Sequence, residues 1–183
     1  MSVKVSVYIA TSLDGFIARE DGGLDWLDAA NAMVPDGEDL GFQAFIDSVD
    51  ALIMGRKTFE KVVSFCLWGY GQTPVVVLSR SPISFPPGVP ATLTHSSEPL
   101  RVLLRRLSDS GARHVYVDGG TTIQGFLAEG LVDEITVTVI PIILGGGIPL
   151  FGPTEHDINL THVRTTAYDF GFVRSIYSVD QEG

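Results

Sequence analysis

The chain has 183 residues, of which 45% are hydrophobic and 19% charged, a composition typical of one folded domain spanning residues 1–183. Its formal net charge of −10 disfavours binding to nucleic acid or to an anionic membrane, since both repel it. Cys66 is the only cysteine, which excludes an intrachain disulfide and disfavours a cysteine-based zinc site. With no signal region and no apolar run of membrane-spanning length, a cytoplasmic protein is expected.

Apolar and polar residues alternate from residue 3 to residue 9, which predicts a strand with two distinguishable faces. A segment without regular periodicity follows over residues 12–37. It is longer than most connections in a compact domain, so we expect it to form a lid or a wall of a substrate site. Trp26 has an alternative interpretation, in which it only anchors this segment to the body of the protein.

Apolar residues at positions i, i+3, i+4 and i+7 from Phe42 predict a helix that begins near residues 36–39. Carboxylates suit the first turn of a helix because they face the positive end of its dipole. Glu38 and Asp39 therefore have a structural interpretation as surface acids, besides any role in a site.

Residues 51–60 predict a buried strand that turns directly into an amphipathic helix. Four apolar residues precede the glycine of the turn, and apolar residues then recur at helical spacing as far as Cys66. Free backbone N–H groups, two cations and a hydroxyl meet at this helix start, a combination that attracts phosphate. The alternative is an ordinary turn with solvated cations. The helix start comprises Gly55, Arg56, Lys57 and Thr58.

A second buried strand is expected at residues 74–78, where consecutive apolar residues indicate that both faces are covered. Ser79 and Arg80 follow its carboxyl end. Ligands of open α/β sheets collect at the carboxyl ends of the strands, so Arg80 is expected on the same edge as Gly55.

A second glycine turn is predicted after a strand at residues 114–117. Asp118 precedes two glycines and two threonines, and a helix then runs to Gly130. Glycine lets the backbone approach a ligand without a Cβ in the way, and threonine adds a hydroxyl donor. The turn comprises Gly119, Gly120, Thr121 and Thr122.

Two strands are predicted near the C-terminus, at residues 135–139 and 172–179, both as antiparallel edges of the sheet. Between them, residues 141–151 contain three consecutive glycines among apolar residues. Such a segment suggests a backbone pressed against another part of the molecule or against a partner subunit.

Several catalytic signatures are absent from the sequence, namely the glycine-rich dinucleotide fingerprint, the P-loop, H-E-x-x-H and G-x-S-x-G. The four histidines show no metal-ligand spacing either. Together these absences disfavour hydrolytic metal chemistry and a serine nucleophile. What remains is two helix starts and Arg80. A guanidinium at a strand end suits the 2′-phosphate that distinguishes NADPH from NADH.

With these motifs the chain resembles the dihydrofolate-reductase-like fold, and within it the C-terminal reductase domain of the bifunctional riboflavin-biosynthesis deaminase-reductase and its stand-alone relatives. Residues 5–18 resemble the opening strand and S-L-D-G loop of riboflavin-type reductases, and residues 53–60 resemble the I-M-G-R-x-T-[WF]-E motif of dihydrofolate reductases. Residues 78–80 resemble the strand end that receives the 2′-phosphate, residues 117–120 the second glycine turn, and residues 144–151 the riboflavin-type C-terminal motif.

The resemblance implies a three-layer αβα fold, with a mixed sheet of about eight strands flanked by helices. It also implies an NADPH-dependent reductase. The two glycine turns would hold the phosphates of NADPH, Ser79 and Arg80 the 2′-phosphate, and Ala10 and Ile17 would lie near the nicotinamide. The implied coenzyme residues are Ala10, Ile17, Gly55, Arg56, Lys57, Thr58, Leu78, Ser79, Arg80, Val117, Gly119, Gly120, Thr121 and Thr122.

Hydride transfer to a C=N bond leaves electron density on nitrogen, so the chemistry asks for one acid beside the acceptor. Asp39 ranks first, because it precedes residues 54–56 at the distance of the pterin-binding carboxylate in dihydrofolate reductases. Asp14 ranks second, because it matches the loop aspartate of the riboflavin type. Its alternative role is to form an Asp-Gly turn.

The substrate stays open between a riboflavin-pathway pyrimidine, as in 5-amino-6-(5-phosphoribosylamino)uracil reductase, and a pterin. The loop after Gly15 lacks basic residues for a phosphoribosyl group, and no arginine is identified for the glutamate tail of folate. We therefore expect hydride transfer from NADPH to a small heterocyclic or imine-type substrate, by a homodimer. The alternative is a nucleotide-binding dimer of the same fold without catalysis.

Overall fold

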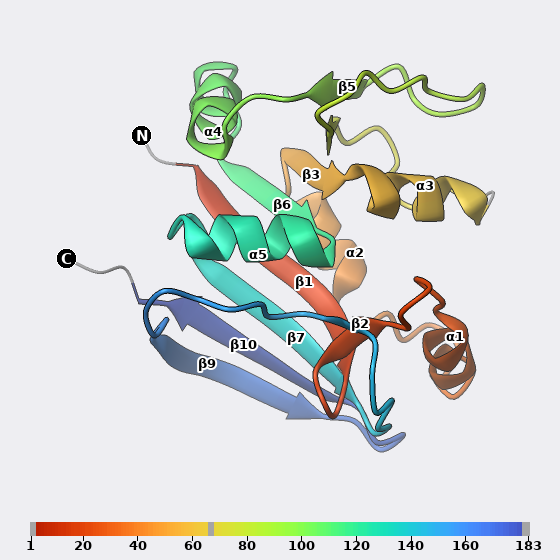
Figure 1. Cartoon of the computed structure of the whole chain (residues 1–183). Coiled ribbons are helices and arrows are strands. Elements are labelled where there is room, and N and C mark those ends of the chain that lie inside the picture. The colour runs from red at the N-terminus through yellow and green to blue at the C-terminus, as the bar shows by residue number, and fades with distance from the viewer. Residues whose placement is uncertain (1–2, 66–67, 181–183) are drawn as a thin grey trace.

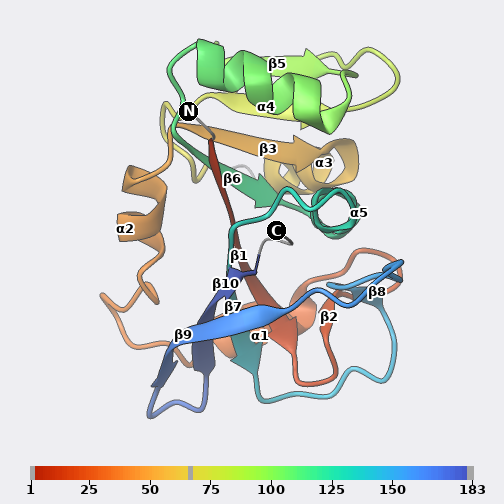
Figure 2. The ribbon, with the colours of Figure 1, turned by 90° about the vertical axis from the view of Figure 1, so that its left-hand side faces the viewer.

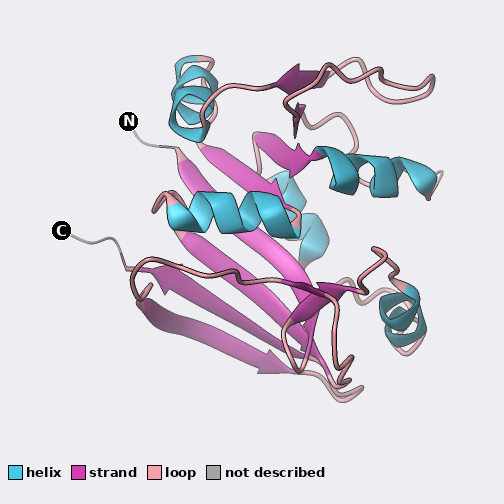
Figure 3. Ribbon diagram, in the orientation of Figure 1, coloured by secondary structure: helices cyan, strands magenta, loops and turns pink. Residues whose placement is uncertain are grey.

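The computed structural model describes residues 3–65 and 68–180, and it contains an eight-stranded mixed sheet flanked by helices (Figures 1 and 3). The strand order is β5-β4-β3-β6-β1-β7-β10-β9, and β2 pairs with β8 in a separate small sheet. This is the predicted three-layer α/β architecture. The elements are β1 (Lys4–Ser12), β2 (Phe16–Ala18), α1 (Asp25–Asn31), α2 (Phe42–Asp47), β3 (Ala51–Gly55), α3 (Arg56–Ser64), β4 (Val75–Leu78), β5 (Leu93–Ser96), α4 (Leu100–Asp109), β6 (His114–Asp118), α5 (Gly120–Ala128), β7 (Glu134–Ile140), β8 (Ile148–Pro149), β9 (Leu160–Ala167) and β10 (Val173–Val179).

The strands from β5 to β7 in the sheet order run parallel, whereas β10 is antiparallel to both of its neighbours. Parallel strands are covered on both faces, which explains their unbroken apolar runs. Val75, Val76 and Val77 of β4 are at most 3% exposed, as predicted. Because the strands are parallel, the carboxyl ends of β4, β3, β6 and β1 share one edge of the sheet.

Helices pack on both faces of the sheet, and Figure 2 shows α2 on one side and α5 on the other. Val5 and Val7 of β1 join the core beneath α4 and α5. Tyr8 points the other way and stacks on Phe45 of α2, with ring centroids 4.9 Å apart. We call this second side, which carries Tyr8, the α2 face of the sheet. Residues of adjacent strands that share a register position lie on the same face.

The segment over residues 12–37 is more regular than predicted, because it contains helix α1. Trp26 of α1 is 3% exposed and packs with Ile140 and Phe172, so it anchors the segment to the body of the protein. The next helix, α2, begins at Phe42 and not near residues 36–39. Leu40 and Gly41 have φ values of 59° and 80°, in the left-handed region, and this conformation prevents the helix from starting earlier.

The C-terminal strands correct the prediction in two respects. Strand β7 is not an edge, because it pairs in parallel with β1 on one side and antiparallel with β10 on the other. Strand β10 is antiparallel, as predicted, but it is not an edge either, because it lies between β7 and β9. The edge is β9, which the sequence did not predict because almost all its residues are exposed and leave no apolar alternation. Cys66, expected on α3, lies outside the described residues. Among the helices that the structure describes, none is long and apolar enough to cross a bilayer.

Candidate functional site

The two predicted glycine turns lie against each other, because β3 and β6 are neighbours in the sheet. A Cβ added at Gly55 would lie 2.8 Å from Oγ1 of Thr122, and a Cβ at Gly119 would collide with Oγ1 of Thr58. Gly119 also has a φ of 97°, which disfavours any other residue. Each turn therefore requires glycine because the other turn is so close.

Two helices start at this meeting point, each nine residues long and neither with a side-chain cap at its N-terminus. Uncapped N-terminal N–H groups and the helix dipole favour an anion at both starts. Arg56 and Lys57 add two exposed cations to the start of α3. Nε of Arg56 lies 2.8 Å from Glu60, but both side chains are more than half exposed, so the pair is weak.

Ser79 and Arg80 complete this edge of the sheet. Leu78, the last residue of β4, is in register with Gly55 of β3, so the residues that follow both strands are adjacent. The backbone after β4 is fixed, since the Ser79 N–H donates to the Ser96 carbonyl and its own carbonyl lies 2.8 Å from Nε2 of His95. Arg80 is exposed beside the first glycine turn, as the sequence predicted.

Ile17 lies beside the second glycine turn. A Cβ at Gly120 would lie 2.9 Å from Cδ1 of Ile17, so this side chain covers the start of α5. Ala10 is three residues beyond Val7, which is in register with Val117 at the end of β6. Val117 is fully buried, so only its backbone can face a ligand. The structure thus brings the predicted coenzyme residues to one edge of the sheet.

Asp14 ties two loops together. Its carboxylate accepts hydrogen bonds from the backbone N–H groups of Leu144 and Gly145, at 3.1 and 2.8 Å, and from the Ser12 hydroxyl, at 2.6 Å. The Ser12 bond is the main cause that lowers the pKa of Asp14, and the two backbone donors add to it. Asp14 therefore favours the charged form and positions the glycine-rich segment next to its own loop.

Asp39 lies at the start of α2, where its two oxygens accept from the N–H groups of Gly41 and Gln43, at 2.8 and 2.9 Å. The Gln43 bond lowers the pKa of Asp39 most, followed by the Gly41 bond. This carboxylate caps the helix, as in the structural interpretation of the sequence. Both predicted acids are exposed and hold their charge more firmly than an ordinary carboxyl.

Asp118 is an acid of opposite character that the sequence reasoning did not select. Burial raises its pKa to about 6, although hydrogen bonds from the Gly119 N–H, at 2.8 Å, and from the Tyr70 hydroxyl favour the charged form. It follows Val117 in β6 and so lies on the α2 face, beside Tyr8. The available signal was its position directly before the second glycine turn.

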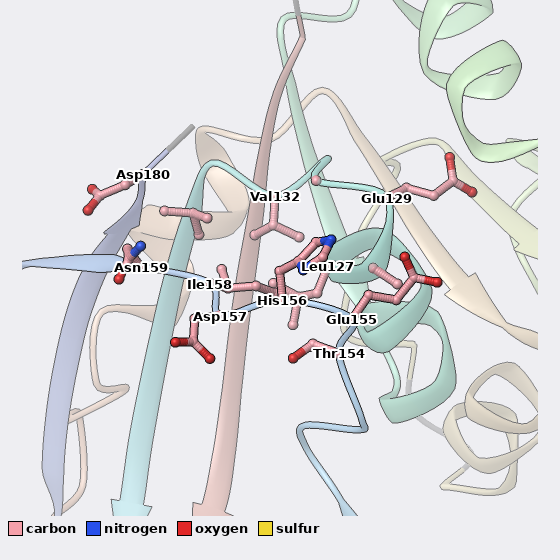
Figure 4. A pocket seen from close by; sticks show the side chains of 13 residues that line it. Leu127, Glu129, Val132, Thr154, Glu155, His156, Asp157, Ile158, Asn159 and Asp180 are labelled. Atoms are coloured by element: carbon pink, nitrogen blue, oxygen red, sulfur yellow. The ribbon is translucent and has the colours of Figure 1, made fainter. Parts of the chain in front are cut away.

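A cavity of about 320 Å³ lies at the other end of α5, away from the glycine turns (Figure 4). The carboxylates of Glu129, Glu155, Asp157 and Asp180 surround it and would repel a phosphate. It is therefore a poor coenzyme site. Within residues 3–65 and 68–180, no group of three or more His, Cys, Asp or Glu side chains is arranged to hold a metal ion.

The strand order and the position of both turns define a domain of the dihydrofolate-reductase-like fold. The structure aligns with dihydrofolate reductase from Enterococcus faecalis, solved with NADP(H), over 97% of this chain and 96% of that chain. The TM-score is 0.64 and the sequence identity is 16%, so the likeness is one of fold.

Within this fold, the chain belongs to the family of the RibD C-terminal domain, whose model matches residues 3–173. It is 37% identical to the uncharacterized protein YwjB of Bacillus subtilis over 163 residues, which are 87% of this chain and 89% of YwjB. The crystal structure of a candidate riboflavin biosynthesis protein from Shewanella sp. PV-4 has a TM-score of 0.90 and 39% identity, covering 97% and 99% of the two chains. The family supports a reductase-type function.

Proposed function

We propose that this protein is an NADPH-dependent reductase that transfers a hydride to a small heterocyclic or imine-type substrate. The observation that carries the proposal is the meeting of Gly55 and Gly119 at the starts of two uncapped helices. One helix start attracts one phosphate, and two adjacent starts suit a dinucleotide with a pyrophosphate. The family and its dihydrofolate-reductase-like fold support the same chemistry.

The coenzyme would lie along the carboxyl edge of β4, β3 and β6. Backbone N–H groups at the starts of α3 and α5, with Arg56 and Lys57, would hold its phosphates, and Ser79 and Arg80 would hold the 2′-phosphate. Ala10 and Ile17 would border the nicotinamide, where Ile17 excludes water. Bound NADPH supplies the hydride.

The protein itself must supply the proton. In this proposal Asp118 donates it, because a carboxyl with a pKa of about 6 keeps part of its protons near neutral pH. Asp39 binds and orients the substrate as a charged carboxylate at the start of α2. Asp14 acts by holding the loop of residues 12–18 against the glycine-rich segment.

A nucleotide-binding dimer without catalysis is the second candidate. It is favoured by the lowered pKa values of Asp14 and Asp39, the two acids that the resemblance implies, since both prefer to remain charged. The edge strand β9 offers a surface for a second copy, because Leu160 and Val163 are 41% and 58% exposed.

NADPH binding, followed by protein fluorescence, tests the coenzyme site. Turnover is tested by NADPH oxidation with dihydropterin, deaminated pyrimidine and simple imine substrates, on wild type and on Asp118→Asn, Asp39→Asn and Asp14→Asn. We expect turnover of at least one class and its loss in Asp118→Asn with NADPH binding retained. Binding without turnover of any class would favour the non-catalytic dimer.

A further inference from the structure

Tyr70 lies in the loop between α3 and β4, and its hydroxyl donates a hydrogen bond to the Asp118 carboxylate. The Thr73 N–H donates to the Tyr70 carbonyl at 3.1 Å, which closes a turn in this loop. The ring of Trp68 packs edge-on against that of Tyr70, with centroids 5.4 Å apart. The loop that follows α3 therefore reaches the carboxyl end of β6.

Asp118 lies in mostly apolar surroundings on the α2 face. It is in register with Met54 of β3, which has no exposed surface. Tyr8 of β1 lies on its other side, one residue beyond the register pair of Val7 with Val117. Within residues 3–65 and 68–180, Asp118 forms no ion pair. Its carboxylate therefore depends on hydrogen bonds for its partners.

Of the tyrosines near Asp118 in the described part of the chain, only Tyr70 donates to its carboxylate. Tyr116, two residues earlier on β6, donates its hydroxyl to the Tyr8 carbonyl at 2.9 Å. Tyr8 donates its own hydroxyl to the Leu40 carbonyl at 2.6 Å. Burial raises the pKa of the Tyr70 hydroxyl well above its ordinary value, and the charge of Asp118 adds to this effect. Tyr70 therefore remains a donor at every pH near neutrality.

The charged side chains at the starts of the two neighbouring helices act elsewhere. At the start of α3, Nε of Arg56 lies 2.8 Å from Glu60, and Lys57 is exposed. At the start of α2, both oxygens of Asp39 accept from backbone N–H groups of that helix. The protonation of Asp118 is therefore set by its burial and by its hydrogen bonds.

Tyr70 acts on Asp118 in two opposite ways. Its ring covers the carboxyl and withdraws it from water, which favours the neutral acid. Its hydroxyl donates to the carboxylate, which favours the charged form. Burial prevails, because the pKa of Asp118 is raised to about 6 in spite of the hydrogen bonds. One side chain thus helps to keep the proton on the carboxyl and fixes the direction in which the carboxyl points.

From this arrangement we infer that Tyr70 is the positioning residue of the proton donor: its hydroxyl orients the Asp118 carboxyl, and its ring keeps water away from it. The inference rests on the proposed function, because it assigns a role within the same site. The proton passes from the carboxyl oxygen to the substrate nitrogen, so that an O–H bond breaks and an N–H bond forms. The carboxylate that remains is stabilised by the Tyr70 hydroxyl, and the solvent returns a proton to it once the product has left.

Carboxyl NMR tests the pair without any substrate. The full chain is labelled with ¹³C at the aspartate side-chain carboxyl, and Asp118→Asn identifies the Asp118 signal. Tyr70→Phe keeps the ring and removes the hydrogen bond, so the titration midpoint of Asp118 should rise by ~1 pH unit. Tyr70→Ala also removes the cover and admits water, so the midpoint should fall below the wild-type value, because burial is the larger effect.

Tyr177→Phe is the matched control for the loss of a hydroxyl. Tyr177 lies on β10 in register with Ile135, which belongs to the core on the opposite face of the sheet. This variant should leave the Asp118 midpoint unchanged.

Turnover tests whether the pair serves the reaction. NADPH oxidation is measured with the substrate that wild type reduces fastest among the dihydropterin, deaminated pyrimidine and simple imine classes. Only the protonated acid donates, so turnover should decline as the pH rises through the Asp118 midpoint. The decline should move to higher pH in Tyr70→Phe and to lower pH in Tyr70→Ala, while the KM for NADPH stays the same.

An Asp118 midpoint that does not move in Tyr70→Phe would overturn the inference. So would midpoints that move in the same direction in both Tyr70 variants, since the ring would then not exclude water. A moved titration with an unmoved turnover profile would also overturn it, because Tyr70 would then serve only the fold. If wild type reduces no substrate, the proposed function fails, and the titration alone decides whether Tyr70 controls the proton on Asp118.

Discussion

The substitution Asp118→Asn gives a pH-dependent test of the site. Burial raises the pKa of this carboxyl from 3.8 to about 6, so the folded protein holds the proton more tightly than the unfolded chain does. Stability from the protonated form is therefore fully present below about pH 4 and is lost as the pH rises to about 6. Above pH 6, the free energy of unfolding is lower than at acid pH by at most about 3 kcal/mol. This figure is an upper limit because the Asp118 side chain keeps some solvent contact.

The asparagine amide reproduces the hydrogen bonds of the neutral acid, since its oxygen can accept from the Gly119 N–H and its nitrogen can donate to Tyr70. Above pH 7 we therefore expect the variant to be more stable than wild type by about 2 to 3 kcal/mol, with a difference that shrinks towards pH 5. Turnover should fall while NADPH binding persists, because the amide cannot donate a proton to the product.

Urea unfolding at pH 5, 6, 7 and 8, followed by circular dichroism, measures the free energy of unfolding at each pH. The range stays above the isoelectric point of about 4.6, where solubility is lowest. Asp109→Asn, on the exposed side of α4, is the matched control and should show no such trend. A difference between Asp118→Asn and wild type that does not change with pH would refute the reasoning.

Two further predictions concern the coenzyme edge. Arg80→Ala should weaken NADPH binding by ~10- to 100-fold and leave NADH binding unchanged, because it removes the charge-assisted bonds to the 2′-phosphate. Fluorescence titration with both coenzymes checks this, with Arg105→Ala on α4 as the control variant. Equal losses of affinity for both coenzymes would count against the assignment. Gly119→Ala should destabilise the fold by more than Gly130→Ala in urea unfolding: both glycines have positive φ, but only the first would drive a Cβ into the other turn. Strain from positive φ alone costs about 1–2 kcal/mol, so equal effects would show that the turns do not interlock.

Local patterns carried most of the fold prediction. The alternation in β1, the apolar run of β4 and the glycines at the starts of α3 and α5 depend on neighbouring residues, so the sequence contains them directly. The fold class came from the resemblance of these motifs to the dihydrofolate-reductase-like fold. The exposed strand β9 was missed for the same reason, because a strand with both sides in solvent leaves no apolar period.

The chemistry of single groups depends on residues far apart in the sequence. Asp118 becomes a weak acid because β6 is central in the sheet and Tyr70 covers it, whereas Asp39 stays charged because backbone N–H groups at the start of α2 face it. No spacing rule predicts either environment.

The sequence by itself determined that two glycine-bounded helix starts and an arginine follow buried strands, because strand, turn and helix are set by local preferences. Only the tertiary structure decided that these turns touch and that Asp118 is half-buried beside Tyr70. The physical reason is that burial and register arise from contacts between strands that are distant in the sequence. These contacts set the pKa of Asp118 and bring the two glycine turns together.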